Sequence, residues 1–247
     1  MADWNDLRQQ QTGFGSVPRA GDAVARQATY DMGLRAHMLK IYNYMTSGVL
    51  LTGIVALVAF TSGLAVSFAS GPLMWLVALS PLAIVFAMSF GANRFSTATL
   101  QAMFWGFAAL MGLSMSTIFL VFTGSSIAAT FFATAGAFAG LSLYGYTTKK
   151  SLSGMGTFLI MGVVGLLIAM VLNIFLQSSA LGLAISFIGV LIFAGLTAYD
   201  TQRLKEQYTV LRGSEFAGKA VVLGALTLYL DFINMFQFLL SFMGNRD

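Results

Sequence analysis

Two aspartates stand where the sequence is otherwise apolar. Asp231 lies in the middle of ALTLYLDFINMF (residues 225–236), and Asp200 ends another apolar run, in AYDTQRLK (198–205). The other acids fall in the polar N-terminal stretch, in the loop before Asp231 or at the last residue. An ionised carboxylate at membrane depth costs at least about 2.5–3.5 kcal/mol, so such residues usually face a protein interior and carry function.

The chemistry of these two residues depends on whether they meet. Two carboxylates a few ångströms apart cannot both ionise cheaply, so they would share one proton and act as a proton-sensitive switch. Fully ionised, they would also offer hard oxygen ligands to a divalent cation, Ca²⁺ above all. Taken alone, the pattern is equally consistent with an interfacial Asp200 that pairs with Arg203. A carboxylate at a helix C-terminus would, however, oppose the macrodipole of that helix. Counting residues places Asp231 deeper than Asp200, so they meet only if the last helix begins well inside the cytosol or the helices tilt.

A polar stripe surrounds Asp231 on its own segment. Thr227, Asp231 and Asn234 follow at helical spacing, and Gln237 extends the stripe by one more step. Polar side chains on an apolar span cannot face lipid, so this face should meet protein or a water-filled path. We therefore expect these residues to line a polar path and the last helix to be central.

The elements that must position these residues are membrane helices. Hydrophobic residues make up 57% of the 247 residues and charged residues only 9%, against about 25% charged in a soluble domain. The apolar runs have the length of about 20 residues that a helix needs to cross a bilayer. We predict an all-α polytopic protein in which residues 1–37 form a polar cytosolic tail and 38–247 a seven-helix domain. The expected spans are residues 41–61, 72–90, 98–121, 125–146, 156–176, 181–199 and 221–242.

The loop charges predict an orientation. Of the 13 lysines and arginines, all except Arg246 fall on one side of a seven-span arrangement, which by the positive-inside rule is the cytosol. The N-terminus is then cytosolic and the C-terminus outside. A six-span alternative, with one apolar run re-entrant, would put both termini inside. Because the positive charges lie in short loops, they do not indicate a nucleic-acid partner.

Other membrane chemistries lack their residues. The chain has no cysteine and a single histidine, His37, which precedes the first span. Cysteine catalysis, thiolate metal sites, a Ser–His pair and a paired-histidine zinc site within the bilayer are therefore excluded. No cofactor is expected, with Ca²⁺ considered only as a permeant or bound ion at Asp200 and Asp231.

Four segments resemble one known family. GLTAYDTQRLK (195–205) followed by LGALTLYLDFINMFQFLL (223–240) is similar to the signature of the transmembrane Bax inhibitor family, in its bacterial branch. SLYGYTTKKSLSGMG (142–156) and GLSMSTIFLVFT (112–123) resemble the same branch. The resemblance runs from Lys40 to the C-terminus.

The resemblance implies a seven-helix fold with the last helix surrounded by the other six, in a bacterial inner membrane. It implies a pH-sensitive calcium leak gated by Asp200 and Asp231, with an arginine at the inner end of the second helix latching the first aspartate. Arg94, in SFGANRFST, fits that place. Some relatives carry a glutamate within the second helix, and PLAIVFAMSF here has none.

Two alternatives remain open. Some relatives are linked to stress and protease modulation, so the chain could instead regulate a membrane-anchored protease or channel, with the N-terminal tail as the contact. Aspartates on consecutive spans also describe intramembrane aspartyl proteases, and Tyr199–Asp200 matches their first motif. LYLD replaces the Gly-x-Gly-Asp of their second motif, and the Pro-Ala-Leu element is missing. The favoured expectation is a non-enzymatic leak whose partners are the bilayer and Ca²⁺.

Overall fold

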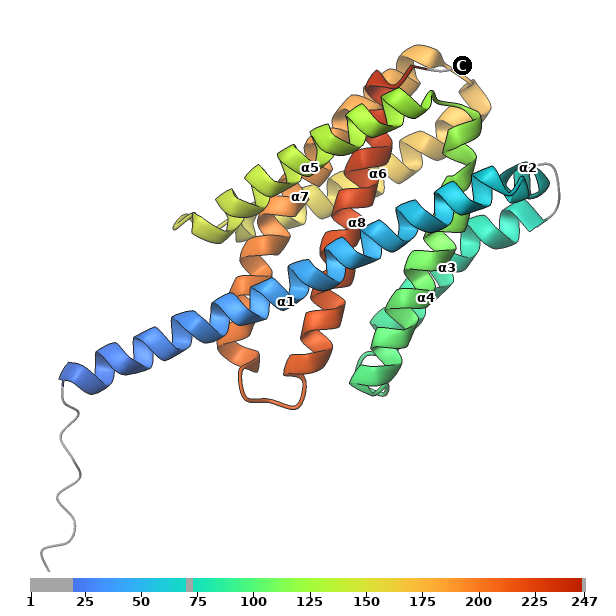
Figure 1. Cartoon of the computed structure of the whole chain (residues 1–247). Helices are drawn as coiled ribbons and strands as arrows, with labels where there is room; N and C mark the ends of the chain where they lie inside the picture. Colours follow the sequence, from blue (N-terminus) through green and yellow to red (C-terminus); the bar gives the residue numbers. More distant parts are fainter. Residues whose placement is uncertain (1–19, 70–72, 246–247) are drawn as a thin grey trace, which may run out of the picture.

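The computed structural model describes residues 20–69 and 73–245, and this part of the chain is helical with short connections (Figure 1). It confirms the all-α polytopic prediction, with an apolar helix at each of the seven predicted spans, and adds one short helix, α2. The helices are α1 (Ala20–Thr61), α2 (Leu64–Ala69), α3 (Leu73–Gly91), α4 (Thr97–Met115) continued by the 3₁₀ helix η2 (Ser116–Leu120), α5 (Gly124–Thr147), α6 (Ser153–Leu176), α7 (Ser179–Leu211) and α8 (Ala217–Met243).

Length and hydropathy identify the membrane segments. Six helices are long and apolar enough to cross a membrane, and α3 contributes a shorter apolar segment, Trp75–Gly91. The outer surface is strongly apolar, and on α6 only 11% of the most hydropathic window is buried within the protein. Phe175, for example, is 81% exposed. Such a surface is compatible with lipid and not with water, so the helices contact the bilayer directly.

The last helix is central, as predicted. In α8, 67% of the hydropathic window is buried, more than in any other candidate span among the described residues. α8 packs against α1, α4, α5 and α7, whereas α3 lies chiefly on α4 and α6 on α7 (Figure 1). The immediate wall around α8 therefore consists of four helices, not the six that the family resemblance implied.

Side-chain caps fix where three of the helices begin. The hydroxyl groups of Ser96, Thr123 and Ser178 accept hydrogen bonds from backbone N–H groups three residues further on, at the starts of α4, α5 and α7. Such caps satisfy donors that a helix leaves unpaired at its first turn. The tight turns that result keep successive helices adjacent.

Two helices extend well beyond the predicted spans. α1 begins at Ala20, so the described residues of the predicted 1–37 tail are helical, and residues 1–19 lie outside the described part. α7 continues past Tyr199 to Leu211, which reduces the expected long loop to residues 212–216. The sequence prediction ended each span where charges appear, but charged residues are good helix formers. α7 stops only before Gly213, whose φ of 77° suits glycine.

Candidate functional site: an aspartate pair between α7 and α8

The antiparallel pair α7–α8 brings Asp200 and Asp231 to nearly the same level. α7 ends at Leu211, about 16 Å beyond Asp200, and α8 begins at Ala217, about 21 Å before Asp231, at about 1.5 Å per residue. A short turn joins the two ends, so the residues differ by only about one helical turn in height. The register difficulty is resolved because α7 continues past Asp200 to Leu211, so that both aspartates lie at a similar distance from the α7–α8 turn. Asp200 lies inside α7, so the argument that it opposes the dipole at a helix C-terminus is wrong.

The two carboxyl groups meet inside the protein. Their residues are only 6% and 4% exposed, and the side chains are within hydrogen-bonding reach of each other. Among the described residues, Asp200 Oδ1 and Asp231 Oδ2 are buried without a hydrogen-bond partner. A single proton held between the remaining oxygens would relieve the repulsion between two buried charges. The geometry thus brings together the pair that the sequence singled out.

Arg203 supplies the positive charge at this site. Its Nη1 atom lies 3.3 Å from Asp200 Oδ1, and its side chain is 44% exposed while that of Asp200 is 8% exposed. The guanidinium also acts electrostatically on Asp231. Arg203 therefore connects the buried pair to the end of the bundle that holds the α7–α8 turn. Asp200 thus lies next to both Arg203 and Asp231.

The two residues that follow Asp200 help to fix α7 against its neighbours. The Thr201 hydroxyl donates to Ser142 Oγ on α5 at 3.5 Å. The Gln202 amide binds the α5–α6 turn twice, accepting from Leu152 N at 2.7 Å and donating to Lys150 O at 2.9 Å. Sequence reasoning missed Gln202, whose buried position next to the aspartate segment only the fold reveals.

A second polar node fixes the rotation of α8. The hydroxyl of the fully buried Tyr229 lies 2.6 Å from Thr52 Oγ1. The Thr52 hydroxyl in turn donates to the carbonyl oxygen of Ala108 at 2.8 Å. The Tyr229 ring also packs edge-on against Phe107, with centroids 5.0 Å apart. These contacts join α1, α4 and α8 two residues before Asp231. They fix the rotation of α8 so that the Asp231 carboxyl group faces α7. Sequence reasoning did not find this node either.

Arg94 lies in the turn between α3 and α4. Its backbone N–H donates to Gly91 O at 2.9 Å, and Lys219 of α8 holds the same turn by donating to Ala92 O at 3.3 Å. Within the described part of the chain, the ion pair of Asp200 is with Arg203 rather than Arg94. A latch between Arg94 and Asp200 remains a prediction for a different arrangement of the bundle.

Apart from Asp231, the polar residues of the stripe on α8 either bind the backbone of their own helix or line a cavity, and Asn234 does both. Thr227 and Asn234 donate to carbonyl oxygens of their own helix, at Leu223 and Leu230. Asn234 and Gln237 also line a cavity of about 550 Å³ between α6, α7 and α8, on the far side of Asp231 from the α7–α8 turn. Three further polar residues line this cavity, namely Asn173, Ser186 and Ser241.

The pair alone is a weak resident metal site. Among the described residues, no group of three or more His, Cys, Asp or Glu side chains could hold a metal ion. Asp200 and Asp231 together offer at most four carboxylate oxygens, whereas Ca²⁺ takes about 6–8 oxygen ligands. A cation here would keep water or recruit backbone oxygens, as an ion in transit does.

A bundle of apolar helices closed around a buried carboxyl pair defines a polytopic membrane protein with an intramembrane titratable site. The chain belongs to the family described as "Inhibitor of apoptosis-promoting Bax1", whose sequence pattern matches residues 34–247, and the resemblance seen in the sequence is confirmed.

Three similar proteins are bacterial and of similar length. Inner membrane protein YbhL of Escherichia coli K12 is 43% identical over 233 residues, covering 93% of this chain and 98% of that protein. An uncharacterized protein of Caulobacter vibrioides is 46% identical over 230 residues, covering 88% of this chain and 92% of its own. Uncharacterized protein RP147 of Rickettsia prowazekii is 42% identical over 225 residues, covering 90% and 95%.

Proposed function

We propose that the protein is a pH-sensitive cation leak of the bacterial inner membrane, with Ca²⁺ as the favoured ion and the Asp200–Asp231 pair as its gate. The observation that carries the proposal is the direct approach of two buried carboxyl groups on adjacent helices. A buried pair of carboxyl groups is expensive to keep, so such residues usually carry function. The inner-membrane location follows the name of the E. coli relative.

The seam between α7 and α8 offers a route for an ion. At one end, the half-exposed Arg203 lies toward the α7–α8 turn. At the other, the cavity lined by Asn234 and Gln237 provides amide and hydroxyl oxygens. The aspartate pair lies between the two, at the point where the seam is closed. Acidic oxygens at a narrow point attract cations and exclude anions.

The proton count of the pair would control the seam. With one shared proton, the carboxyl groups hold each other and α7 stays packed on α8. Loss of that proton leaves two like charges at close range, which repel each other and favour a packing in which the seam is looser. The same ionised oxygens would then be free to bind the passing cation. Flux should therefore rise with pH until the pair is fully ionised.

The deciding experiment is calcium flux into proteoliposomes at several pH values, comparing wild type with Asp231→Asn. Glu206→Gln is a matched control because Glu206 is an exposed acid on the same helix as Asp200. The proposal expects pH-dependent flux in wild type and in the control, and flux without pH dependence in Asp231→Asn. An unchanged pH profile in Asp231→Asn would remove the pair from gating.

The absence of flux at any pH, from protein shown to be folded, would contradict the leak altogether. That outcome would favour the alternative of a regulatory protein that contacts a membrane-anchored protease or channel. Deleting residues 2–19 separates the two ideas further, because a leak built from α7 and α8 should survive the deletion. Cleavage of a transmembrane substrate that is lost in both Asp200→Asn and Asp231→Asn would instead indicate an aspartyl protease.

A further inference from the structure

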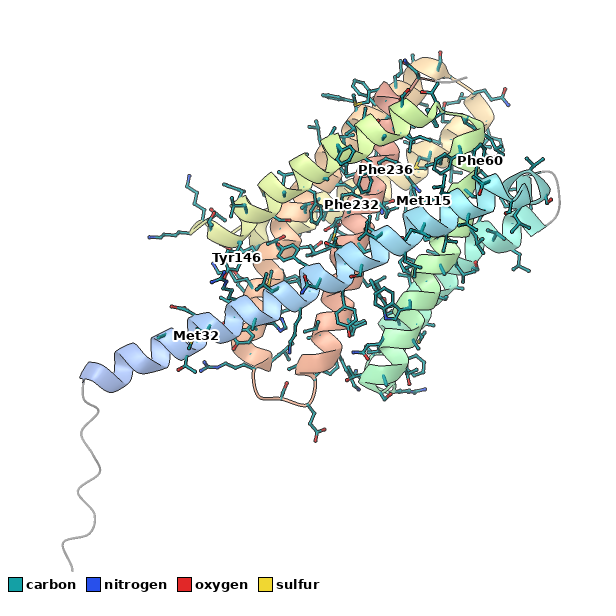
Figure 2. The ribbon with its side chains drawn as sticks, viewed as in Figure 1. Met32, Phe60, Met115, Tyr146, Phe232 and Phe236 are labelled. Carbon is teal, nitrogen blue, oxygen red and sulfur yellow. The ribbon has the colours of Figure 1, made fainter. Side chains whose placement is uncertain are left out.

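A long groove separates α1 from α5 and does not belong to the aspartate site. Its cavity has a volume of about 670 Å³, and it runs from Arg35 and Tyr146 at one end to Leu50 and Phe131 at the other. We call it the α1–α5 groove. In Figure 2, Tyr146 and Phe232 lie in the space between the α5 and α1 ribbons, along this groove.

The walls of the α1–α5 groove are apolar and open sideways. Leu39, Leu50 and Leu143 line it and are 50%, 56% and 63% exposed. In a bilayer, these side chains face the hydrocarbon, so the groove opens toward lipid and not toward water. The floor is Phe232 of α8, which packs edge-on against Phe138 and Phe131.

Positive charge gathers at one end only. Among the described residues, Arg35 is the single charged side chain that lines the groove. A second cation stands close by, because Lys205 of α7 donates to Tyr146 O at 2.8 Å and lies 5.3 Å from the centre of the Tyr146 ring. The described residues that line the groove include no acid. This end lies on the side of the basic loops, where anionic lipid headgroups attract arginine and lysine.

The dimensions fit one acyl chain. The segment of α1 from Arg35 to Leu50 extends about 22 Å at about 1.5 Å per residue, which exceeds half of a hydrocarbon core of about 30 Å. An occupant that matches these walls is apolar along its length and negative at one end.

We propose that the α1–α5 groove binds one acyl chain of an anionic phospholipid whose phosphate pairs with Arg35. The second chain of that lipid remains in the bilayer. This site is independent of ion conduction, because it requires only the groove and its basic end.

The groove also backs onto the aspartate pair. Phe232, its floor, directly follows Asp231, and Ser142, which lines it, accepts the hydrogen bond of Thr201, the neighbour of Asp200. A bound chain therefore packs against the segments that carry both carboxyl groups. Through this contact, lipid composition gains a route to the packing of α8 on α5.

Native mass spectrometry of the delipidated full chain tests the site with phosphatidylglycerol and phosphatidylethanolamine of identical acyl chains. We expect one retained phosphatidylglycerol and weaker retention of phosphatidylethanolamine. Arg35→Gln should weaken retention of phosphatidylglycerol about fivefold, the value of one arginine beside an anionic headgroup. Lys40→Gln is the matched control, since Lys40 is an exposed cation on the same helix outside the groove.

A second pair of variants tests the groove itself. Ala139→Trp places a large ring inside it and should abolish retention of both lipids, whereas Ala137→Trp, on the exposed side of the same helix, should not. Circular dichroism and gel filtration establish that each variant is folded. Equal loss in Arg35→Gln and Lys40→Gln, equal retention of the two lipids, or retention in Ala139→Trp would overturn the proposal. So would a dimer mass in place of a lipid adduct, which would assign the groove to a second copy. The measurement needs no ion gradient, so its failure leaves the proposed leak untouched.

Discussion

Gly145 of α5 lies directly against the backbone carbonyl of Ala198 on α7, so that a Cβ atom at position 145 would run into that oxygen. This close contact between α5 and α7 lies two residues before Asp200. It depends on a position that has no side chain, because backbone cannot move aside as a flexible side chain can.

Gly145→Ala should therefore destabilise the protein. Forcing a methyl group into this crossing should lower the free energy of unfolding by about 1–3 kcal/mol. Gly140→Ala is the control on the same helix, since a Cβ there meets nothing within 4 Å. Thermal unfolding in detergent should show a lower midpoint for Gly145→Ala and an equal or higher one for Gly140→Ala. Equal midpoints would mean that α5 can shift away from α7 at little cost.

Tyr229→Phe should weaken the attachment of α8 to α1 and α4. The substitution keeps the ring but removes the hydrogen bond to Thr52, which within a membrane bundle is worth about 0.6–1.7 kcal/mol. Tyr144→Phe serves as the control, because Tyr144 is 51% exposed on α5. Chemical unfolding in mixed micelles should show a loss for Tyr229→Phe alone. A similar response of both variants would argue that the Thr52 contact contributes no net stability.

Arg203→Gln should change the pH at which the proposed leak responds. The guanidinium 3.3 Å from Asp200 favours the ionised form of that carboxylate, so its removal should move the flux profile toward higher pH. Because Arg203 is 44% exposed, water screens much of its effect, and the shift should stay below about one pH unit. Lys149→Gln, an exposed cation on the α5–α6 turn, is the control. A shift toward lower pH would contradict this role of Arg203.

Gln202→Ala should loosen the α5–α6 turn. The substitution removes the hydrogen bond that Gln202 donates to Lys150 O and the one that it accepts from Leu152 N. The buried Leu152 N–H is left unpaired, at a cost of about 1–3 kcal/mol. Hydrogen–deuterium exchange should become faster at residues 149–153. Glu206→Ala, an exposed position on the same helix, should leave that exchange unchanged. Unaltered protection in Gln202→Ala would show that helix packing alone holds the turn.

Hydropathy predicted the parts of this fold that lipid determines. The segments in which charged residues are rare predicted the seven apolar runs. The two places where a carboxylate interrupts such a segment predicted the candidate pair Asp200 and Asp231 and the central position of the last helix. Helix ends did not follow, because hydropathy marks the limits of the membrane whereas a helix stops at a cap or a glycine such as Gly213. The most important difference from the predicted helix ends is the extension of α7 to Leu211, because it brings Asp200 and Asp231 to nearly the same level.

The supporting contacts could not be predicted in the same way. Gln202, Tyr229 and Gly145 are common residue types in helices, and nothing in their sequence spacing distinguishes a buried partner from an exposed one. Their roles depend on which helices cross and at what height. The distribution of the polar stripe shows the same limit, because a helical repeat placed Asn234 and Asp231 on one face while the neighbouring helices gave them different surroundings.

The burial of α8 has a consequence for biosynthesis. The most enclosed helix is the last of the described helices to leave the ribosome, so α1, α4, α5 and α7 reach the bilayer before the element that joins them exists. Until α8 arrives, the surfaces that will contact Asp231 and Tyr229 must tolerate lipid or one another. Insertion of α8 into the centre of the bundle is therefore the last step of assembly. Chains that end before Ala217 should remain loosely associated helices, which membrane quality-control proteases can degrade.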